Sequence, residues 1–372
     1  MVLKNLKIVL ENKVIKGSLS FENGIITHIK EGDYFGDALD CKGLIAMPGF
    51  IDIHIHGSAG IDFIDAKEDD YEVIANSLYK EGVTTFLATT LTSDNASLKR
   101  VCETVNKVKA KIPSLGGIHF EGPYINAKYK GAQNEEYIRK PDIKEFDELQ
   151  KISGNNVKYI TLAPENEGAM EFIEHVTNSG VVASAGHSGA SFDDVKAAIM
   201  HGLTNITHTH NAMSPHHHRK PGIVTAAFYF DELYTEFICD KIHVCPNVLL
   251  ASYKIIGPER FIMITDALKA KNSDINEFQL FGLDCIRKDG AAYLTSGPLA
   301  GSLLTMDQGL RNMKEITNAD LCDLAKISSR NAVKSLKMKD RGVIEVGKLA
   351  DFVLLDSDLN VKATYKLGKK VY

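Results

Sequence analysis

The chain has 372 residues, of which 44% are apolar, and a formal net charge of -5. This length exceeds one average domain but accommodates a barrel of about 250 residues with a small additional domain. The mildly acidic balance gives no reason to expect a nucleic-acid or membrane surface, so we expect a small soluble substrate.

The N-terminal segment MVLKNLKIVLENKVIKG has no apolar run long enough for a signal peptide. No window reaches the roughly 18 apolar residues that a membrane-spanning helix needs. Six cysteines are scattered without a C-x-x-C pair, which argues against a disulfide framework or a thiolate zinc site. We therefore expect a cytoplasmic protein with reduced cysteines in its core.

Both ends of the chain are predicted to form short strands. Residues 1–48 alternate apolar and polar positions, with hairpin signals at Glu11-Asn12 and Asn23-Gly24. The tail from Arg341, RGVIEVGKLADFVLLDSDLNVKATYKLGKKVY, has the same character. The economical interpretation is a small β-sandwich domain formed by residues 1–48 and 339–372.

Residues 49–338 contain eight short runs rich in β-branched and small apolar residues, most of them followed by a turn and a helical pattern. The runs are GFIDIHIH, VTTFLATT, GGIHFEG, VKYITLAPE, VVASAGH, LTNITHTH, TEFICD and RFIMITDA. Eight strand-helix repeats favour an α/β fold, the (β/α)8 TIM barrel. The alternative, an open doubly wound sheet, usually has a Gly-rich phosphate turn after its first strand, and HGSAG does not match G-x-G-x-x-G.

Polar side chains recur where these predicted strands end. Residues i and i+2 of a strand share a face, so Asp52, His54 and His56 point one way and the intervening isoleucines the other. Later strand ends carry His119, Glu121, His187, His208, His210 and Asp266. In a barrel these ends converge on the active-site face. Imidazoles and carboxylates gathered there suit zinc or a similar divalent metal.

A single histidine at a strand end is more often a hydrogen-bonded structural residue than a ligand. The recurrence of such residues at several strand ends of one chain favours a metal site. The run His216–His218 is interpreted as a solvated or substrate-facing loop in preference to a ligand cluster. His28, His175 and His201 lie away from the strand ends, and we assign them no role.

These motifs resemble the amidohydrolase superfamily and, within it, the family of N-acetylglucosamine-6-phosphate deacetylases. The resemblance runs from MPGFIDIHIHG through HFEGPYINAKYKGA, SAGHS, THTHNAMSPHHHRKPG and ITDAL to GVIEVGKLADFVLLD. HFEGP and HNAM are typical of the deacetylases, whereas H-x-H and the tail phrase are shared across the superfamily. The resemblance implies metal-dependent deacetylation of N-acetylglucosamine-6-phosphate, a barrel with a β-sandwich, and a homodimer.

The resemblance also implies which residues form the site. Asp266 matches the catalytic carboxylate, and His54 and His56 match a pair that holds a second metal in some members. Glu121, His187 and His208 match the main metal ligands of the family. The positions that match substrate-binding ones in the family are Gln133, Asn211, Ala212, Arg219 and His243, and the resemblance leaves open whether Arg219 serves its own or the neighbouring subunit. We expect one or two divalent ions per subunit, with zinc as the first choice and iron, cobalt or manganese as alternatives.

Gln133 departs from the family pattern, because members commonly carry a histidine there that touches sugar hydroxyls. Glutamine differs in reach and charge, so the galactosamine epimer of the substrate stays open. Another amidohydrolase acting on a cyclic amide or acyl amino acid is a further alternative. Many of those enzymes use a modified lysine at the end of the fourth strand, where this chain reads TLAPEN. Asp266 argues against a catalytically silent binding protein, which would gain little from a proton-transfer carboxylate.

Overall fold

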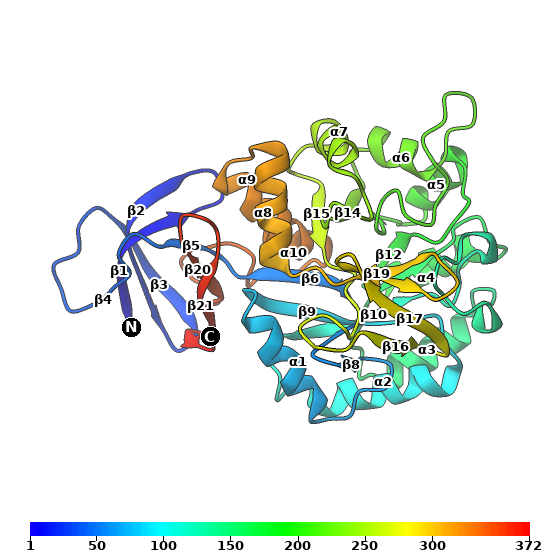
Figure 1. Cartoon of the computed structure of the whole chain (residues 1–372), viewed down its shortest axis with the longest axis horizontal. Coiled ribbons are helices and arrows are strands. Elements are labelled where there is room, and N and C mark those ends of the chain that lie inside the picture. The colour runs from blue at the N-terminus through cyan, green and yellow to red at the C-terminus, as the bar shows by residue number, and fades with distance from the viewer.

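A computed structural model describes residues 1–372, which form a barrel with a separate β-sheet at its side (Figure 1). The blue and red strands at the left of the figure are the two ends of the chain, brought together in that sheet. No helix of the chain combines the length and the apolar character that crossing a membrane requires.

Eight short parallel strands form the barrel, in sequence order around its wall. They are β6 (Phe50–Ile55), β9 (Val83–Thr90), β10 (Leu115–Glu121), β11 (Val157–Leu162), β12 (Val182–Ala185), β13 (Asn205–Ile206), β14 (Tyr234–Ile238) and β15 (Phe261–Ile264). The backbone N–H of Asp266 donates to the carbonyl of His54 across 2.8 Å, which joins the last strand to the first. Each strand falls within one of the eight runs or within one residue of it, so the predicted barrel is confirmed.

Helices cover the outside of this barrel (Figure 1). They are α1 (Asp70–Tyr79), α2 (Asn95–Val108), α3 (Ile143–Ile152), α4 (Ala169–Asn178), α5 (Phe192–Met200), α6 (Ile223–Tyr229), α7 (Pro246–Ile256) and α8 (Met306–Thr317), followed by α9 (Leu321–Ala325) and α10 (Asn331–Ser335). The start of α5 shows why the sequence folds this way. The Ser191 hydroxyl accepts the N–H of Asp194, and the Asp194 carboxylate accepts the N–H of Ser191, which forms a capping box.

The terminal sheet combines strands from both ends of the chain. Its order is β22 (Lys369–Lys370), β21 (Val361–Lys366), β20 (Phe352–Leu355), β5 (Ile45–Pro48), β1 (Val2–Val9), β2 (Val14–Glu22) and β3 (Ile25–Glu31), and β4 (Leu39–Asp40) pairs with β1. The C-terminal β20 is antiparallel to the N-terminal β5, so neither end can form this sheet alone. The sheet has its own apolar core, which includes Leu19, Phe21 and Phe352.

A four-stranded antiparallel sheet between β15 and α8 was not predicted. It consists of β16 (Glu277–Leu280), β17 (Leu283–Lys288), β18 (Ala291–Leu294) and β19 (Leu299–Ser302). Phe278, Leu280 and Cys285 pack with Leu91 and Leu268 in a small apolar cluster beside the barrel. A two-stranded hairpin, β7 (Gly57–Ser58) and β8 (Ile61–Asp62), follows the first barrel strand.

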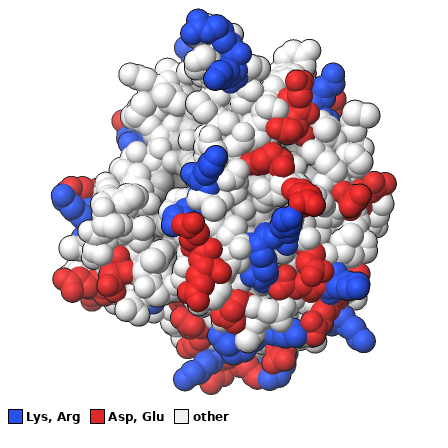
Figure 2. All heavy atoms as spheres, turned by 90° about the vertical axis from the view of Figure 1, so that its right-hand side faces the viewer, with Lys and Arg blue, Asp and Glu red and all other residues white.

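Acidic and basic side chains are mixed over the face of the barrel that is turned away from the terminal sheet (Figure 2). Neither sign of charge covers that face continuously. The figure therefore shows no single-sign field there for steering a polyanion or polycation.

Candidate active site

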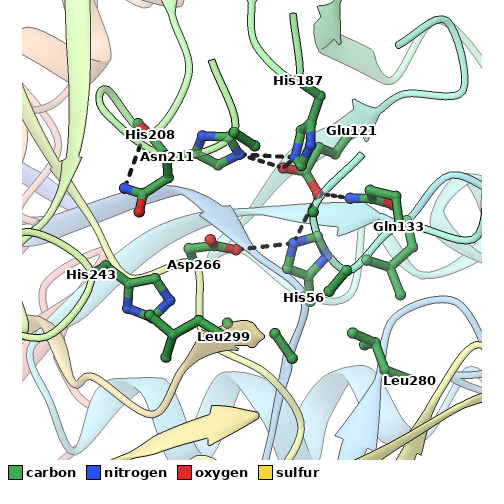
Figure 3. A pocket seen from close by; sticks show the side chains of 16 residues that line it. His56, Glu121, Gln133, His187, His208, Asn211, His243, Asp266, Leu280 and Leu299 are labelled. Atoms are coloured by element: carbon green, nitrogen blue, oxygen red, sulfur yellow. Dashed lines mark hydrogen bonds and ion pairs between the residues drawn. The ribbon is translucent and has the colours of Figure 1, made fainter. Parts of the chain in front are cut away.

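Glu121, at the end of β10, lies at the centre of the polar strand ends (Figure 3). Its Oε1 is 3.1 Å from His187 Nε2, 3.0 Å from His208 Nε2 and 3.3 Å from His54 Nε2. Its Oε2 is 3.3 Å from His56 Nε2. One carboxylate thus contacts four imidazoles that come from three other parts of the barrel.

Glu121, His187 and His208 form the first group that can hold a metal ion, with ligand atoms within 4.8 Å of one another. His187 Nδ1 lies 2.9 Å from the carbonyl oxygen of Tyr129, which can only accept. The proton of a neutral His187 therefore sits on Nδ1, and the Nε2 lone pair faces Glu121. His187 and His208 have φ of 49° and 26°, a backbone region that costs about 1–3 kcal/mol per residue and is typical of functional sites.

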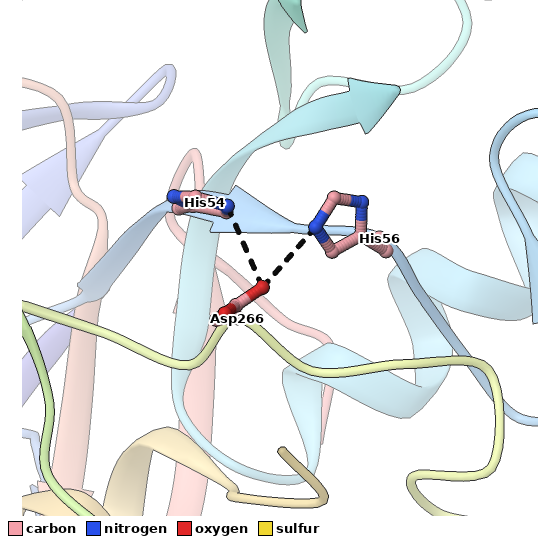
Figure 4. Close-up of side chains that lie close together, drawn as sticks. All are labelled: His54, His56 and Asp266. Carbon is pink, nitrogen blue, oxygen red and sulfur yellow. Dashed lines mark ion pairs between the residues drawn. The ribbon is translucent and has the colours of Figure 1, made fainter. Parts of the chain in front are cut away.

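His54, His56 and Asp266 form the second group (Figure 4). Asp266 Oδ1 is 3.1 Å from His56 Nε2 and 3.5 Å from His54 Nε2. Asp266 also has a positive φ, 49°, so the chain turns sharply after β15 and aims the carboxylate at β6. The two groups meet at Glu121, which contacts ligand atoms of both.

Burial and charge set the protonation of this cluster. Burial raises the pKa of Glu121, but His54 and His187 outweigh burial and hold that pKa well below its usual range. Burial lowers the pKa of His56, but hydrogen bonds with Asp266 and Glu121 raise it to about 9. The pKa of His54 is raised well above its usual value as well, so His54 and His56 take up protons when no cation is present. Metal binding must displace those protons.

The donor set fits a pair of divalent ions. Four imidazoles and two carboxylates are the ligands that zinc and similar transition metals take from proteins. His54 Nε2 is buried and has no hydrogen-bond partner, although it points at two carboxylates. A buried imidazole nitrogen in that position is suited to coordinate a cation.

A cavity of about 210 Å³ opens above these two groups. Besides the ligands, it is lined by Leu91, Gly131, Ala132, Gln133, Asn211, Ala212, His243, Leu280, Leu299, Ala300 and Gly301. Four of the five substrate-binding positions implied by the resemblance are therefore at the cavity. Arg219 is not, because it is exposed on the loop between β13 and α6. Leu280 and Leu299 bring the unpredicted antiparallel sheet to the cavity wall.

The model of the amidohydrolase family matches residues 45–371. The chain belongs to the amidohydrolase family. N-acetylglucosamine-6-phosphate deacetylase of Lysinibacillus sphaericus is 39% identical, over 90% of this chain and 87% of that protein. N-acetylgalactosamine-6-phosphate deacetylase of Escherichia coli O157:H7 is 33% identical, over 87% of each chain.

A solved structure of N-acetylglucosamine-6-phosphate deacetylase from Thermotoga maritima superimposes with a TM-score of 0.93. It is 34% identical, and the match covers 100% of this chain and 99% of that chain. Family and relatives together identify this amidohydrolase as a hydrolase of amide C–N bonds.

The Gln133 side chain of this amidohydrolase forms hydrogen bonds at the cluster of candidate metal ligands. Its Nε2 donates a short hydrogen bond to Glu121 Oε2, and its Oε1 accepts the N–H of Thr92 across 2.8 Å. The amide thereby links a ligand carboxylate to the backbone that follows β9. One amide N–H remains for a substrate atom in the cavity.

The two remaining histidines of the strand ends contact other side chains of the protein and not the cavity. His119 is fully buried, lies 2.8 Å from the Thr161 hydroxyl, and packs edge-on beneath His54. Burial and the charge of His54 hold its pKa well below the usual range, so it is neutral. His210 lies 2.9 Å from the Ser252 hydroxyl, and burial lowers its pKa to about 4. Neither residue lines the cavity.

Sequence reasoning missed two carboxylates that contact these histidines. Asp240 accepts a hydrogen bond from His243 Nδ1 across 2.6 Å. Glu236 accepts one from His54 Nδ1 across 3.0 Å. A signal existed for each, because Asp240 begins a short turn three residues before His243, and Glu236 is the single charged residue in an otherwise uncharged barrel strand.

Proposed function

We propose that this amidohydrolase removes the acetyl group of N-acetylglucosamine-6-phosphate and yields glucosamine-6-phosphate and acetate. The observation that carries the proposal is the placement of Asp266, whose carboxylate faces the cavity beside two groups of metal ligands. A proton-transfer carboxylate next to a metal centre is the arrangement that metal-assisted hydrolysis needs. The relatives named above support the choice of substrate.

Glu121, His187 and His208 would hold one ion, and His54 and His56 with Asp266 a second. A divalent ion in such a site supplies an acidified water and a polarised carbonyl. The histidine and carboxylate donors favour zinc, with iron, cobalt or manganese as alternatives.

Asp266 performs the proton transfers in this mechanism. Its carboxylate takes a proton from the attacking water and delivers it to the amide nitrogen as the C–N bond breaks. His243 lies on the Asp266 side of the cavity (Figure 3) and donates a hydrogen bond to the acetyl oxygen. Such a donor contributes about 3 kcal/mol when charge develops on that oxygen.

The 6-phosphate orients the sugar. Asn211 and the backbone N–H of Ala212 bind it from within the cavity, where that N–H has no acceptor in the chain. Arg219 provides a forked, charge-assisted contact that lysine cannot reproduce. Because Arg219 is exposed and absent from the wall of its own cavity, we assign it to the phosphate of the neighbouring subunit in a homodimer.

Gln133 is assigned to the substrate as well, through the amide N–H that Glu121 does not use. The enzyme is assigned to the cytoplasm, since its six cysteines are free and five are buried thiols. We assign residues 1–48 and 339–372 to one domain and residues 49–338 to a second, the barrel domain.

The test is acetate release by the purified protein after its metal content has been measured. The substrates are N-acetylglucosamine-6-phosphate, its galactosamine epimer, and both unphosphorylated sugars. We expect rapid release from the phosphorylated glucosamine substrate only. Faster release from the galactosamine epimer would favour the second candidate, which the Escherichia coli relative and the Gln133 departure support. No release from any sugar would redirect the search to cyclic amides.

A further inference from the structure

Glu236 is a carboxylate buried inside the barrel beneath the second metal group. It lies on β14, its side chain has no exposed area, and it does not line the cavity. No lysine or arginine lies within ion-pair distance of it, and its only partner of that kind is His54. A buried carboxylate without a lysine or arginine partner is costly, so the presence of Glu236 beneath this group calls for a reason.

The Glu236 contact fixes the orientation of His54. Nδ1 of His54 lies 3.0 Å from Glu236 Oε2, and a carboxylate oxygen accepts, so Nδ1 carries the proton. The other nitrogen, Nε2, then presents its lone pair toward Asp266 and Glu121, at 3.5 and 3.3 Å. A carboxylate behind a ligating histidine fixes the ring and increases the basicity of the ligand.

Two further hydrogen bonds hold the Glu236 carboxylate in place. The Tyr159 hydroxyl donates to Oε1 across 2.5 Å, and burial together with Glu236 raises the pKa of Tyr159 well above its usual range. The backbone N–H of His208 donates to Oε2 across 3.3 Å. Glu236 therefore contacts one ligand from each metal group and is itself held by a hydroxyl from β11 and an N–H that follows β13.

We propose that Glu236 is a positioning residue that makes the His54–His56–Asp266 group competent to hold a second divalent ion. The inference rests on the two-ion site of the proposed function. Occupancy of that site by the second ion then depends on Glu236, a residue that touches neither the substrate nor an ion.

The test is metal stoichiometry, measured by mass spectrometry on the full-length protein after reloading with Zn²⁺ and removal of free metal. We expect two ions per chain in the unaltered protein. In Glu236→Gln, which keeps the side-chain shape but loses the charge, the second ion should bind about 10- to 100-fold more weakly in chelator competition. The first ion should be retained, which also shows that the variant is folded.

Two variants control this measurement. His54→Ala should lose the second ion outright. Tyr159→Phe removes a hydrogen bond from Glu236 but leaves the Glu236–His54 contact, so it should retain two ions with less than threefold weakening. The inference would be overturned if Glu236→Gln bound the second ion as tightly as the unaltered protein does. It would also be overturned if the unaltered protein bound a single ion.

The outcomes separate this inference from the proposed function. The unaltered protein could bind two ions, and Glu236→Gln could lose one of them, while no sugar releases acetate. That result would support the positioning role of Glu236 and refute the proposed deacetylase activity. Alternatively, the protein could release acetate while Glu236→Gln leaves the affinity for the second ion unchanged. That result would refute the positioning role of Glu236 and support the proposed deacetylase activity.

Discussion

His243 donates from Nδ1 to Asp240 Oδ2 across 2.6 Å, and both side chains are nearly buried. The second oxygen of Asp240 accepts the backbone N–H groups of Ile242 and His243, each across 2.8 Å. The carboxylate therefore fixes the turn after β14 and the imidazole ring together. With Nδ1 committed to Asp240, Nε2 is the ring nitrogen left for a substrate in the cavity that His243 lines.

The first prediction concerns the pH dependence of activity. Burial lowers the pKa of His243, but the hydrogen bond and charge of Asp240, with the charge of Asp266, raise it above its usual value. Nε2 can donate to the acetyl oxygen only while the ring is protonated, so activity should fall as pH rises through this pKa. Asp240→Asn removes the charge and lowers the pKa. The alkaline limb of kcat/KM should therefore move to lower pH.

The matched control for Asp240→Asn is Glu315→Gln. Glu315 is exposed and pairs with Lys241, next to Asp240, across 2.7 Å, so its loss changes surface charge at the same loop without touching His243. Its alkaline limb should coincide with that of the unaltered enzyme. An alkaline limb that stays in place in Asp240→Asn would contradict the assignment of a protonated His243.

The second prediction concerns Asp266. Asp266→Asn retains the shape of the side chain but cannot take up a proton, so kcat should fall by about 10²- to 10⁴-fold. The ion held by Glu121, His187 and His208 should remain, because none of these ligands is altered. Turnover and metal content measured on the same preparation decide the matter. Near-normal turnover with metal bound would show that another group transfers the proton.

The third prediction concerns recognition of the phosphate. Arg219→Ala should raise KM for N-acetylglucosamine-6-phosphate by at least tenfold and leave the slow reaction of the unphosphorylated sugar unchanged, because only the former carries the anion. Lys220→Ala removes a neighbouring exposed cation and should have a much smaller effect. Equal losses on both sugars would mean that Arg219 does not bind the phosphate.

In the proposed homodimer, mixing two variant chains distinguishes the two subunits that Arg219 could serve. In a dimer of one Arg219→Ala chain and one Asp266→Asn chain, an arginine acting across the interface leaves one cavity with both groups intact. About half of the unaltered activity per dimer should then return. If Arg219 served its own cavity, both cavities would lack one group, and the mixed dimer would stay as impaired as its parents.

The barrel and most of the site follow from patterns that are local in sequence. A buried parallel strand favours β-branched and apolar residues, and a run rich in them marks all eight strands. His54 and His56 share a face because strand side chains alternate, and Glu121 and Asp266 join them because parallel strands end at one rim. Their convergence required only the barrel topology.

The two missed carboxylates and the missed sheet required more than local pattern. Glu236 lies 182 residues from His54, and their contact depends on which β14 side chain faces the barrel interior. The antiparallel sheet did carry local signals, the turns Phe281-Gly282 and Asp289-Gly290 between short alternating strands. Those signals fell in a segment where the repeat of a barrel predicts a helix.

The last prediction concerns thiol reactivity. Cys245 is exposed at the start of α7, whereas the other five cysteines are buried. Burial raises the pKa of Cys102 to about 12 and, with a nearby acidic residue, that of Cys41 to about 11, so these thiols carry almost no reactive thiolate at pH 8. An aromatic disulfide reagent should therefore label one thiol per chain in the native unaltered protein and six after that protein is unfolded in guanidinium. It should label no thiol in native Cys245→Ser. Rapid reaction of a second thiol in the native protein would contradict the prediction. It would show that the core around that cysteine opens to solvent frequently.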